Sequence, residues 1–461
     1  RLARRCEWQR TGMQLLEIDR AVEEDESSHK DGDSDTKSTR TSVPATRPPT
    51  GAESSGAPDG PSATRAEAWL AMAGCFYLNM VVLWSYQSLL ASLALYEERW
   101  PRAHVSFTGL VVFGVAMCAG QGLQLATRGA WCRRYGVRII PGYAILTGVC
   151  FVLLLAPSEG TILGSFATVG LVCCLTEAPL YSLASRWRDS ALTTSLNAGN
   201  GAAGVLNISA LTAIRLALSG RRAGAPSTLD RANRVFLLSS LALTAAAIPA
   251  YCALVRVRPL GRALRGAQSQ AAEGKDAGGE VVSYGRVWAQ VRAPFLCQLL
   301  SFATTLLLWP GLACAAEPTG WFAAHAMWFC SPAIIAAFNV ADFVGKAIGN
   351  QPRVVRVLSL RACVLLTVCR AGFAMPIALA LPGSGTSVWS TGVLAAVVGV
   401  GLSNGLLATR TMCLGPQCVQ VHERAVAADF MVLSLYLGIT VGSLSGYAVG
   451  RSVLFSVASE I

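Results

Sequence analysis

Charged side chains are scarce in this 461-residue sequence, in which 14% of the residues are charged and 53% are hydrophobic. A soluble domain of this size needs more charge to cover its surface, so water is not the main solvent of this chain. No stretch resembles a nucleotide-binding loop, a catalytic triad or a metal-binding motif. These absences argue against an enzyme and predict a protein that lies mostly in lipid.

Histidine is also rare, with four residues, and most of the fifteen cysteines fall inside apolar segments without the spacing of metal ligands. Cysteine serves well as a small apolar residue in such segments. We therefore expect no metal site and no cofactor. The segment GNGAAG at 199–204 matches a GxGxxG pattern, but it lies in an apolar segment with no preceding strand, which excludes a dinucleotide-binding fold.

Long apolar segments are what the sequence does have. From residue 67 onward they recur, each with roughly twenty residues, which is enough to cross ~30 Å of hydrocarbon as a helix. The pattern predicts an all-α polytopic membrane protein with about eleven transmembrane helices. The expected spans are 69–95, 105–127, 138–157, 161–184, 193–219, 234–256, 293–317, 325–349, 357–381, 388–411 and 426–449.

Two polar stretches divide the chain. Residues 1–66 are rich in Ser, Thr, Pro, Asp and Glu, so we predict a disordered cytoplasmic tail. Residues 257–292 have the composition of a flexible cytoplasmic linker. Residues 67–256 then hold six helices and residues 293–461 hold five, followed by a short extracellular C-terminus. The simplest architecture is a six-plus-five bundle whose halves meet at a central cavity.

The distribution of basic residues predicts the orientation. With a cytoplasmic N-terminus, the inner connections hold 19 Lys and Arg residues and the outer ones hold 7. The positive-inside rule favours this orientation, although four outer arginines lie between 221 and 234. Residues 1–66 carry 10 basic and 12 acidic side chains, so the remainder carries +13 against a total formal charge of +11, mostly in cytoplasmic connections that face anionic lipid headgroups. We expect the plasma membrane as the location and no nucleic-acid partner.

Ionisable groups inside the spans are the candidates for function, because each costs at least ~2.5 kcal/mol in hydrocarbon unless it faces a cavity or a partner. Asn339, Asp342 and Lys346 are three and four residues apart, so they share one helix face. One interpretation is a polar stripe that lines a substrate path. The alternative is an ion pair that neutralises itself, with Lys346 reaching to the cytoplasmic surface.

Glu177 lies about seven residues from the cytoplasmic end of the fourth span, at a depth similar to that of Asp342. One carboxylate from each half would then share one level of the cavity. The alternative is that Glu177 pairs with Arg186 or Arg188 near the membrane interface. Asp429 is the third acidic residue within the spans, and its place in the first helical turn is explained by the helix dipole.

Other features indicate packing or bending. The segments GNGAAG, which includes Gly199, and GVGLSNG at 399–405 place small residues where helices approach closely. Ser403 and Asn404 add hydrogen-bonding groups that contact either another helix or the cavity. Pro310 removes a backbone hydrogen bond in the seventh span, which is typical of either a hinge or an ordinary kink.

Two motifs resemble the equilibrative nucleoside transporter family. AAFNVADFVGKAIG is similar to its eighth helix, and GLSNGLLATRTMCLGP at 401–416 is similar to its tenth. Weaker similarities are GNGAAG, LLLWPGLA and the residues around Arg370 in the ninth span. The resemblance covers roughly 69–450 and implies a variant of the major facilitator architecture. The positions matching the eighth helix are Phe338, Asn339, Asp342, Gly345 and Lys346.

The resemblance implies that the substrate is held by Asp342 and its basic partner, by a tryptophan of the first helix, here Trp84, and by a polar residue of the fourth, here Glu177. This sequence departs from the family pattern at three of these places. Leu83 and Ser85 replace a proline and an asparagine beside Trp84, and Lys346 replaces an arginine, which removes the bidentate fork but keeps the charge. Glu177 replaces a glutamine and adds a group that can take up a proton.

The predicted function is transport of nucleosides or nucleobases by alternating access, either equilibrative or coupled to protons. Trp84 would stack on the base, and Asp342 would accept hydrogen bonds from ribose hydroxyls or base amines. Two alternatives remain open: a carrier of another polar or cationic solute, recruited by Glu177 and Asp342, and a membrane receptor or scaffold that does not transport.

Overall fold

The computed structural model describes residues 65–126, 135–185, 190–219, 226–257, 283–382 and 389–457. They belong to one compact unit, Ala63–Ile461. The predicted N-terminal tail and most of the predicted linker lie outside the described residues, and so do Arg186 and Arg188.

Helices make up the first half of the bundle. Apolar segments form helices in lipid because only a helix satisfies its own backbone hydrogen bonds there. Each of the six predicted spans in this half corresponds to a long helix or to a pair of consecutive helices. In chain order, the helices of these spans are α2 (Arg65–Ala91) together with the short α3 (Leu93–Arg99); α4 (Val105–Ala126); α5 (Tyr135–Leu155); α6 (Glu159–Ala184); α7 (Ala191–Ser219); and α8 (Pro226–Ala245) together with α9 (Ala247–Arg256).

The second half contains the remaining helices and is more interrupted. Short segments η4 (Ala326–Trp328), α13 (Trp321–Ala324) and α15 (Pro352–Val357) lie in its connections. The main elements are α11 (Tyr284–Leu307) with η3 (Leu308–Leu312) and α12 (Ala313–Ala315), η5 (Phe329–Ile335) with α14 (Ala336–Ile348), α16 (Leu360–Cys369) with η6 (Arg370–Phe373) and α17 (Ala374–Leu379), α18 (Ser390–Gln417), and α19 (Arg424–Val457).

Ten helices in the described part of the chain are long and apolar enough to cross a membrane. They correspond to ten of the eleven predicted spans, with ends that differ by up to nine residues, the largest difference being the start of the seventh at Tyr284 instead of 293. The eleventh predicted span, 325–349, is also helical, but it is divided between the π-helical segment η5 and the 13-residue α14. The predicted all-α polytopic membrane protein is confirmed.

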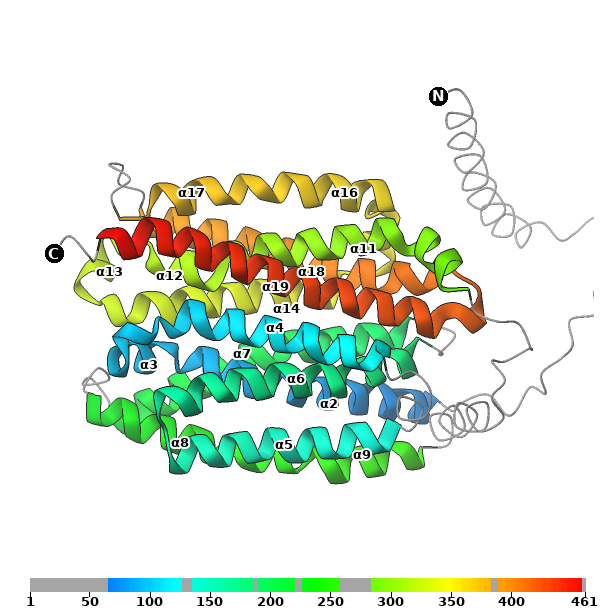
Figure 1. Ribbon diagram of the computed structural model, residues 1–461, viewed down its shortest axis with the longest axis horizontal. Helices are drawn as coiled ribbons and strands as arrows, with labels where there is room; N and C mark the ends of the chain where they lie inside the picture. Colours follow the sequence, from blue (N-terminus) through cyan, green and yellow to red (C-terminus); the bar gives the residue numbers. More distant parts are fainter. Residues whose placement is uncertain are drawn as a thin grey trace, which may run out of the picture. The chain divides into compact units, whose positions relative to one another are not determined.

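The two halves meet through α4 and α7 of the first half and α14 and α19 of the second. Within the halves, α2 packs on α7, α4 on α6, α11 on α19 and α14 on α18. Between the halves, α7 packs on α14 and α4 packs on α19. In Figure 1, α5, α8 and α9 lie along one edge of the bundle and α16 and α17 along the other, with the pairs that join the halves between them.

Small residues allow the closest of these contacts. A Cβ atom on Gly199 would lie 2.1 Å from the carbonyl oxygen of Phe76 in α2. A Cβ atom on Gly405 would lie 2.1 Å from the carbonyl oxygen of Asp342, so α18 approaches the backbone of α14 directly where Asp342 lies. The two small-residue segments therefore serve packing, as small residues commonly do between helices in membranes.

The seventh span is broken at Pro310. Trp309 has extended backbone angles (φ −130°, ψ 143°) inside η3, and the Trp309–Pro310 peptide bond is cis. Beyond the break, Cys314 forms a disulfide bond with Cys330 at the start of the next span, with 4.8 Å between their Cα atoms. This pair corrects the expectation that the cysteines act only as small apolar residues. It joins two spans that are separated by a short connection.

Candidate functional site

A cavity between the two halves contains most of the ionisable groups predicted to be functional. It encloses about 630 Å³ of space between atoms, open solvent at its mouth included. The first half contributes residues of α2, α4, α6 and α7, and the second half contributes residues of α11, η3, α14, α18 and α19. Its polar lining residues are Tyr86, Gln87, Glu177, Asn200, Thr305, Trp309, Asn339, Asp342, Lys346 and Asn404.

Asp342 and Lys346 form a buried ion pair in the cavity wall. The ammonium group of Lys346 lies 2.8 Å from Oδ2 of Asp342, as their spacing of four residues along α14 predicts. Oδ1 of Asp342 accepts a hydrogen bond of 2.8 Å from the amide of Asn404 in α18. The carboxylate thus has a cation on one oxygen and an amide donor on the other, which offsets the cost of removing it from water.

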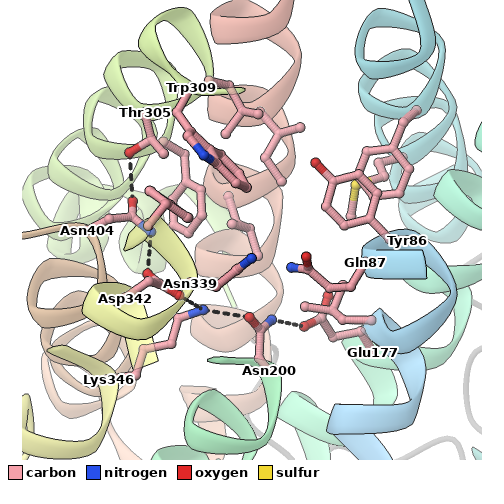
Figure 2. A pocket seen from close by; sticks show the side chains of 18 residues that line it. Tyr86, Gln87, Glu177, Asn200, Thr305, Trp309, Asn339, Asp342, Lys346 and Asn404 are labelled. Carbon is pink, nitrogen blue, oxygen red and sulfur yellow. Dashed lines mark hydrogen bonds and ion pairs between the residues drawn. The ribbon is translucent and has the colours of Figure 1, made fainter. Parts of the chain in front are cut away.

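Lys346 also reaches across the boundary between the halves (Figure 2). Its ammonium group donates a hydrogen bond of 2.5 Å to Oδ1 of Asn200 in α7. The amide nitrogen of Asn200 donates at 3.2 Å to Oε1 of Glu177 in α6, and the hydroxyl group of Tyr436 in α19 donates at 3.3 Å to Oε2. A continuous polar chain therefore links the carboxylates of the two halves through a single lysine.

Glu177 is almost completely buried, with 1% of its surface exposed. The two hydrogen-bond donors that reach its carboxylate, Asn200 and Tyr436, are both neutral. The predicted alternative partners, Arg186 and Arg188, lie outside the described residues. The structure does place Glu177 and Asp342 in one cavity, as their similar depth in the two halves suggested.

A fully buried arginine supports the second-half side of the cavity. Arg370 in η6 donates at 3.0 Å to the carbonyl oxygen of Ser301, at 2.6 Å to the hydroxyl group of Thr305 and at 3.2 Å to the carbonyl oxygen of Val400. Thr305 in turn donates at 2.9 Å to Oδ1 of Asn404. Arg370 thereby fixes the orientation of the amide of Asn404, whose nitrogen bonds Asp342.

Two buried donors in the cavity wall have no hydrogen-bond partner among the described residues. They are Nε1 of Trp309 and Nδ2 of Asn339. The ring of Trp309 is stacked on that of Phe338, with 3.8 Å between centroids and 15° between the planes. A buried donor without a partner costs roughly 1–3 kcal/mol, so these two nitrogens mark a place where an acceptor is missing.

Trp84 lies elsewhere. Its indole Nε1 donates at 2.9 Å to the hydroxyl group of Ser240 in α8, and its ring is stacked on that of Phe236 at 6.5 Å. The side chain therefore faces α8, away from the lining of the cavity. From α2, the cavity is lined by Leu83, Tyr86 and Gln87. This position is a correction to the role that the family resemblance implies for Trp84.

The remaining predicted residues occupy structural positions around the cavity. Ser85 is buried in α2, and Gly199 packs α7 on α2. Ser403 donates to the carbonyl oxygens of Gly399 and Val400 in its own helix. Pro310 lies in the broken segment directly after Trp309.

Beyond Lys346, a second polar contact closes the halves against each other. Asn350, which follows α14, donates at 2.8 Å to Ser190 and at 2.9 Å to Thr194 at the start of α7. These contacts lie at the ends of α14 and α7 that are predicted to face the cytoplasm. The cavity is therefore closed by two layers of hydrogen bonds at that end.

Comparison with known proteins finds similarity to nucleoside transporters. Residues 261–450 match the sequence model of a family described as nucleoside transporters. Equilibrative nucleotide transporter 8 of Arabidopsis thaliana is 29% identical over 114 residues, which are 25% of this chain and 28% of that protein. Equilibrative nucleoside transporter 2 of Homo sapiens is 26% identical over 171 residues, which are 34% of this chain and 35% of that protein. These matches make the chain similar to nucleoside transporters, over its second half in the case of the family model.

The alignments cover about a third or less of either relative's length. The match to the nucleoside transporter family falls on the second half of the bundle. This region includes most of the polar cavity lining, from Thr305 to Asn404, and the positioning residue Arg370. The family is one of transporters, which agrees with the prediction that the chain is not an enzyme.

Several residues of the site were not predicted from the sequence. They include Asn200, Trp309, Thr305 and Tyr436. Asn200 stands in the middle of GNGAAG, where the glycines suggested only packing. Trp309 directly precedes Pro310, and the break in the helix is the one signal that could have directed attention to it, because interrupted helices often line cavities in membrane proteins.

Proposed function

We propose that this protein carries nucleosides across a membrane by alternating access of its two halves around the central cavity. The observation that carries this proposal is the polar chain from Glu177 through Asn200 and Lys346 to Asp342. It joins groups of both halves inside one cavity, in a chain whose residues 261–450 match a family described as nucleoside transporters. Sites between two halves near the middle of the membrane are common in transporters.

The chemistry of the cavity fits an uncharged solute with hydroxyl groups and an aromatic ring. In this proposal, Asp342 and Glu177 accept hydrogen bonds from ribose hydroxyls. Lys346 holds Asp342 in place and donates to a ribose oxygen when the contact with Asn200 opens. Tyr86 supplies aromatic surface for the base, in place of Trp84, and Trp309 lines the opposite half of the cavity.

Proton coupling belongs to the same proposal. Glu177 is buried and its hydrogen-bonding partners are neutral, so its charged form is expensive unless Lys346 lies close by. When the halves separate, the link through Asn200 is broken. A proton taken up by Glu177 would then compensate for the loss of this link, and substrate and proton would move together.

We place the protein in the plasma membrane with a cytoplasmic N-terminus and an extracellular C-terminus. The excess of Lys and Arg in the connections predicted to be cytoplasmic supports this orientation. A protease or an epitope tag at each end of the full chain, in sealed cells, would test it.

The experiment that tests the proposal is uptake of radiolabelled nucleosides into liposomes that contain the purified full chain. We expect uptake that saturates with concentration and that an excess of unlabelled nucleoside suppresses. Liposomes without protein give the background. Uptake equal to this background for all purine and pyrimidine nucleosides would overturn the proposal.

The alternative that the structure favours next is a carrier of cationic solutes. The described part of the cavity places two carboxylates beside one ammonium group, which leaves an excess of negative charge. Competition by organic cations such as choline, in the same liposomes, would distinguish the two. A cationic substrate should be taken up in preference to nucleosides if this alternative is correct.

A further inference from the structure

The cavity wall contains two hydrogen-bond donors that no described residue of the chain satisfies. The indole nitrogen of Trp309 and the amide nitrogen of Asn339 are both buried, with the side chains 3% exposed in each case. Both side chains line the cavity, and one comes from η3 while the other comes from α14. Since buried donors in folded proteins are nearly always paired, a bound solute is the natural source of the missing acceptors.

The orientation of Asn339 is set by its neighbour in α7. Its Oδ1 packs so closely on Gly204 that a Cβ atom there would lie 2.1 Å away. The amide nitrogen therefore points away from α7, and Figure 2 shows it directed toward Gln87 on the other side of the cavity. Trp309 is held by its stacking on Phe338.

Nucleobases differ in how many acceptors they present along one edge. Guanine and other 6-oxopurines present two, N7 and O6, whereas adenine presents N7 beside an amino group that donates. Thymine presents a single oxygen beside a methyl group on the corresponding edge. Two donors that reach one edge of the base would both be satisfied by a 6-oxopurine, whereas adenine would place its amino group against one of them.

We propose that this cavity selects nucleosides of 6-oxopurines, such as inosine and guanosine, over adenosine, with Trp309 and Asn339 as the residues that determine this specificity. This inference rests on the proposed function. When adenosine binds, its amino group would face one of the two donors and leave that donor unpaired in a buried site. The affinity for adenosine should therefore be about tenfold or more weaker than that for inosine. The same loss is expected for a 6-oxopurine whose N7 is replaced by carbon.

The test uses the full chain in liposomes and measures how inosine, adenosine and 7-deazainosine compete with the uptake of radiolabelled inosine. We expect adenosine and 7-deazainosine each to compete about tenfold or more weakly than inosine. Adenosine that competes as well as inosine would overturn the inference while leaving nucleoside transport in place. Absence of uptake and competition for all nucleosides would overturn both.

Two variants test whether each donor contributes to the preference for inosine over adenosine. Trp309→Phe keeps an aromatic ring on Phe338 but removes the N–H group, so the preference for inosine over adenosine should shrink by about tenfold. Asn339→Asp exchanges a donor for an acceptor, which should favour adenosine relative to inosine. Ser445→Ala is a control variant, because Ser445 does not line the cavity and donates to the carbonyl oxygen of Val441 in its own helix. An unchanged ratio of the two substrates in both variants would contradict the assignment.

Discussion

Lys346 of α14 and Asn200 of α7 are joined by a hydrogen bond of 2.5 Å between the ammonium group and the amide oxygen. The bond crosses the boundary between the two halves while the same ammonium group stays 2.8 Å from Asp342 within its own helix. If the halves move apart during transport, the bond to Asn200 must break and the ion pair with Asp342 can remain. Lys346 would then exchange a protein partner for a substrate oxygen.

Asp342→Asn should abolish nucleoside uptake. The substitution keeps the shape of the side chain but leaves the buried ammonium group of Lys346 without a counter-charge, and breaking a buried pair in this way costs about 3–5 kcal/mol. Uptake normalised to the amount of protein in the membrane is the measurement. The double variant Asp342→Asn with Lys346→Met removes both charges, so it should recover protein level but not transport. Near-normal uptake by Asp342→Asn would rule out the role proposed for this carboxylate.

Asn200→Ala should weaken the closure of the halves at the predicted cytoplasmic end. It removes the acceptor of Lys346 and the donor to Glu177 at once, with a loss of about 1–3 kcal/mol for each buried group left unpaired. The readout is the rate at which a thiol reagent labels Cys413, which is buried in α18 near Thr194. We expect faster labelling in Asn200→Ala than in the parent chain. Equal rates would show that Asn200 does not hold the halves together.

The helices were predictable because spans of about twenty apolar residues have one stable form in lipid. The ion pair of Asp342 and Lys346 was also predictable, since residues four apart on a helix are neighbours. The break at Pro310 followed from the missing N–H of proline. The disulfide bond between Cys314 and Cys330 was missed, although both cysteines lie near the facing ends of consecutive predicted spans.

The composition of the cavity was harder to predict, because a helix that is apolar on all sides does not reveal which face meets its neighbours. Residues 84 and 86 of α2 differ by two positions, and they face opposite surroundings: Trp84 packs on α8, whereas Tyr86 lines the cavity. Neither the composition nor the periodicity of α2 distinguishes them. Asn200 was assigned to packing for the same reason, since its neighbours Gly199 and Gly201 do pack on other helices.

Trp84→Ala tests the position of this tryptophan. In the structure it loses a hydrogen bond to Ser240 and stacking on Phe236, so we expect a loss of stability of about 3–5 kcal/mol. Trp84→Phe should recover part of it. If Trp84 instead stacks on the base, Trp84→Ala would weaken substrate binding by about 1–3 kcal/mol with little change in stability. Thermal unfolding in detergent, with and without nucleoside, separates the two outcomes.

Gly405→Ala should destabilise the bundle although alanine favours helices. Its Cβ atom would lie 2.1 Å from the carbonyl oxygen of Asp342 and would push α18 away from α14, at a cost of about 1–3 kcal/mol. Gly148→Ala in α5 is a matched control, since no atom lies within 4 Å of the added Cβ. We expect a lower melting temperature for Gly405→Ala alone. Similar melting temperatures for the two variants would mean that this contact can relax.

Glu177→Gln should remove any dependence of transport on a proton gradient. Glutamine keeps the hydrogen-bonding shape and imitates the protonated carboxyl group, so loaded and empty carriers no longer differ in charge at this position. In the parent chain, protonation makes Glu177 neutral and lowers the cost of separating it from Lys346. Uptake should therefore rise as the pH on the substrate side falls, and it should decline to the equilibrative rate when a protonophore removes the gradient.

The same measurement on both proteins across pH, normalised to protein in the liposomes, separates two roles of this residue. If Glu177 exchanges protons, the parent chain responds to pH and Glu177→Gln transports at a rate that pH does not change. If Glu177 stays ionised as a fixed partner of Asn200 and Tyr436, glutamine reduces the amount of folded protein and the two pH profiles have the same form. A flat profile in the parent chain would eliminate proton coupling and leave an equilibrative nucleoside carrier, because the cavity and its polar chain require no gradient to bind a neutral solute.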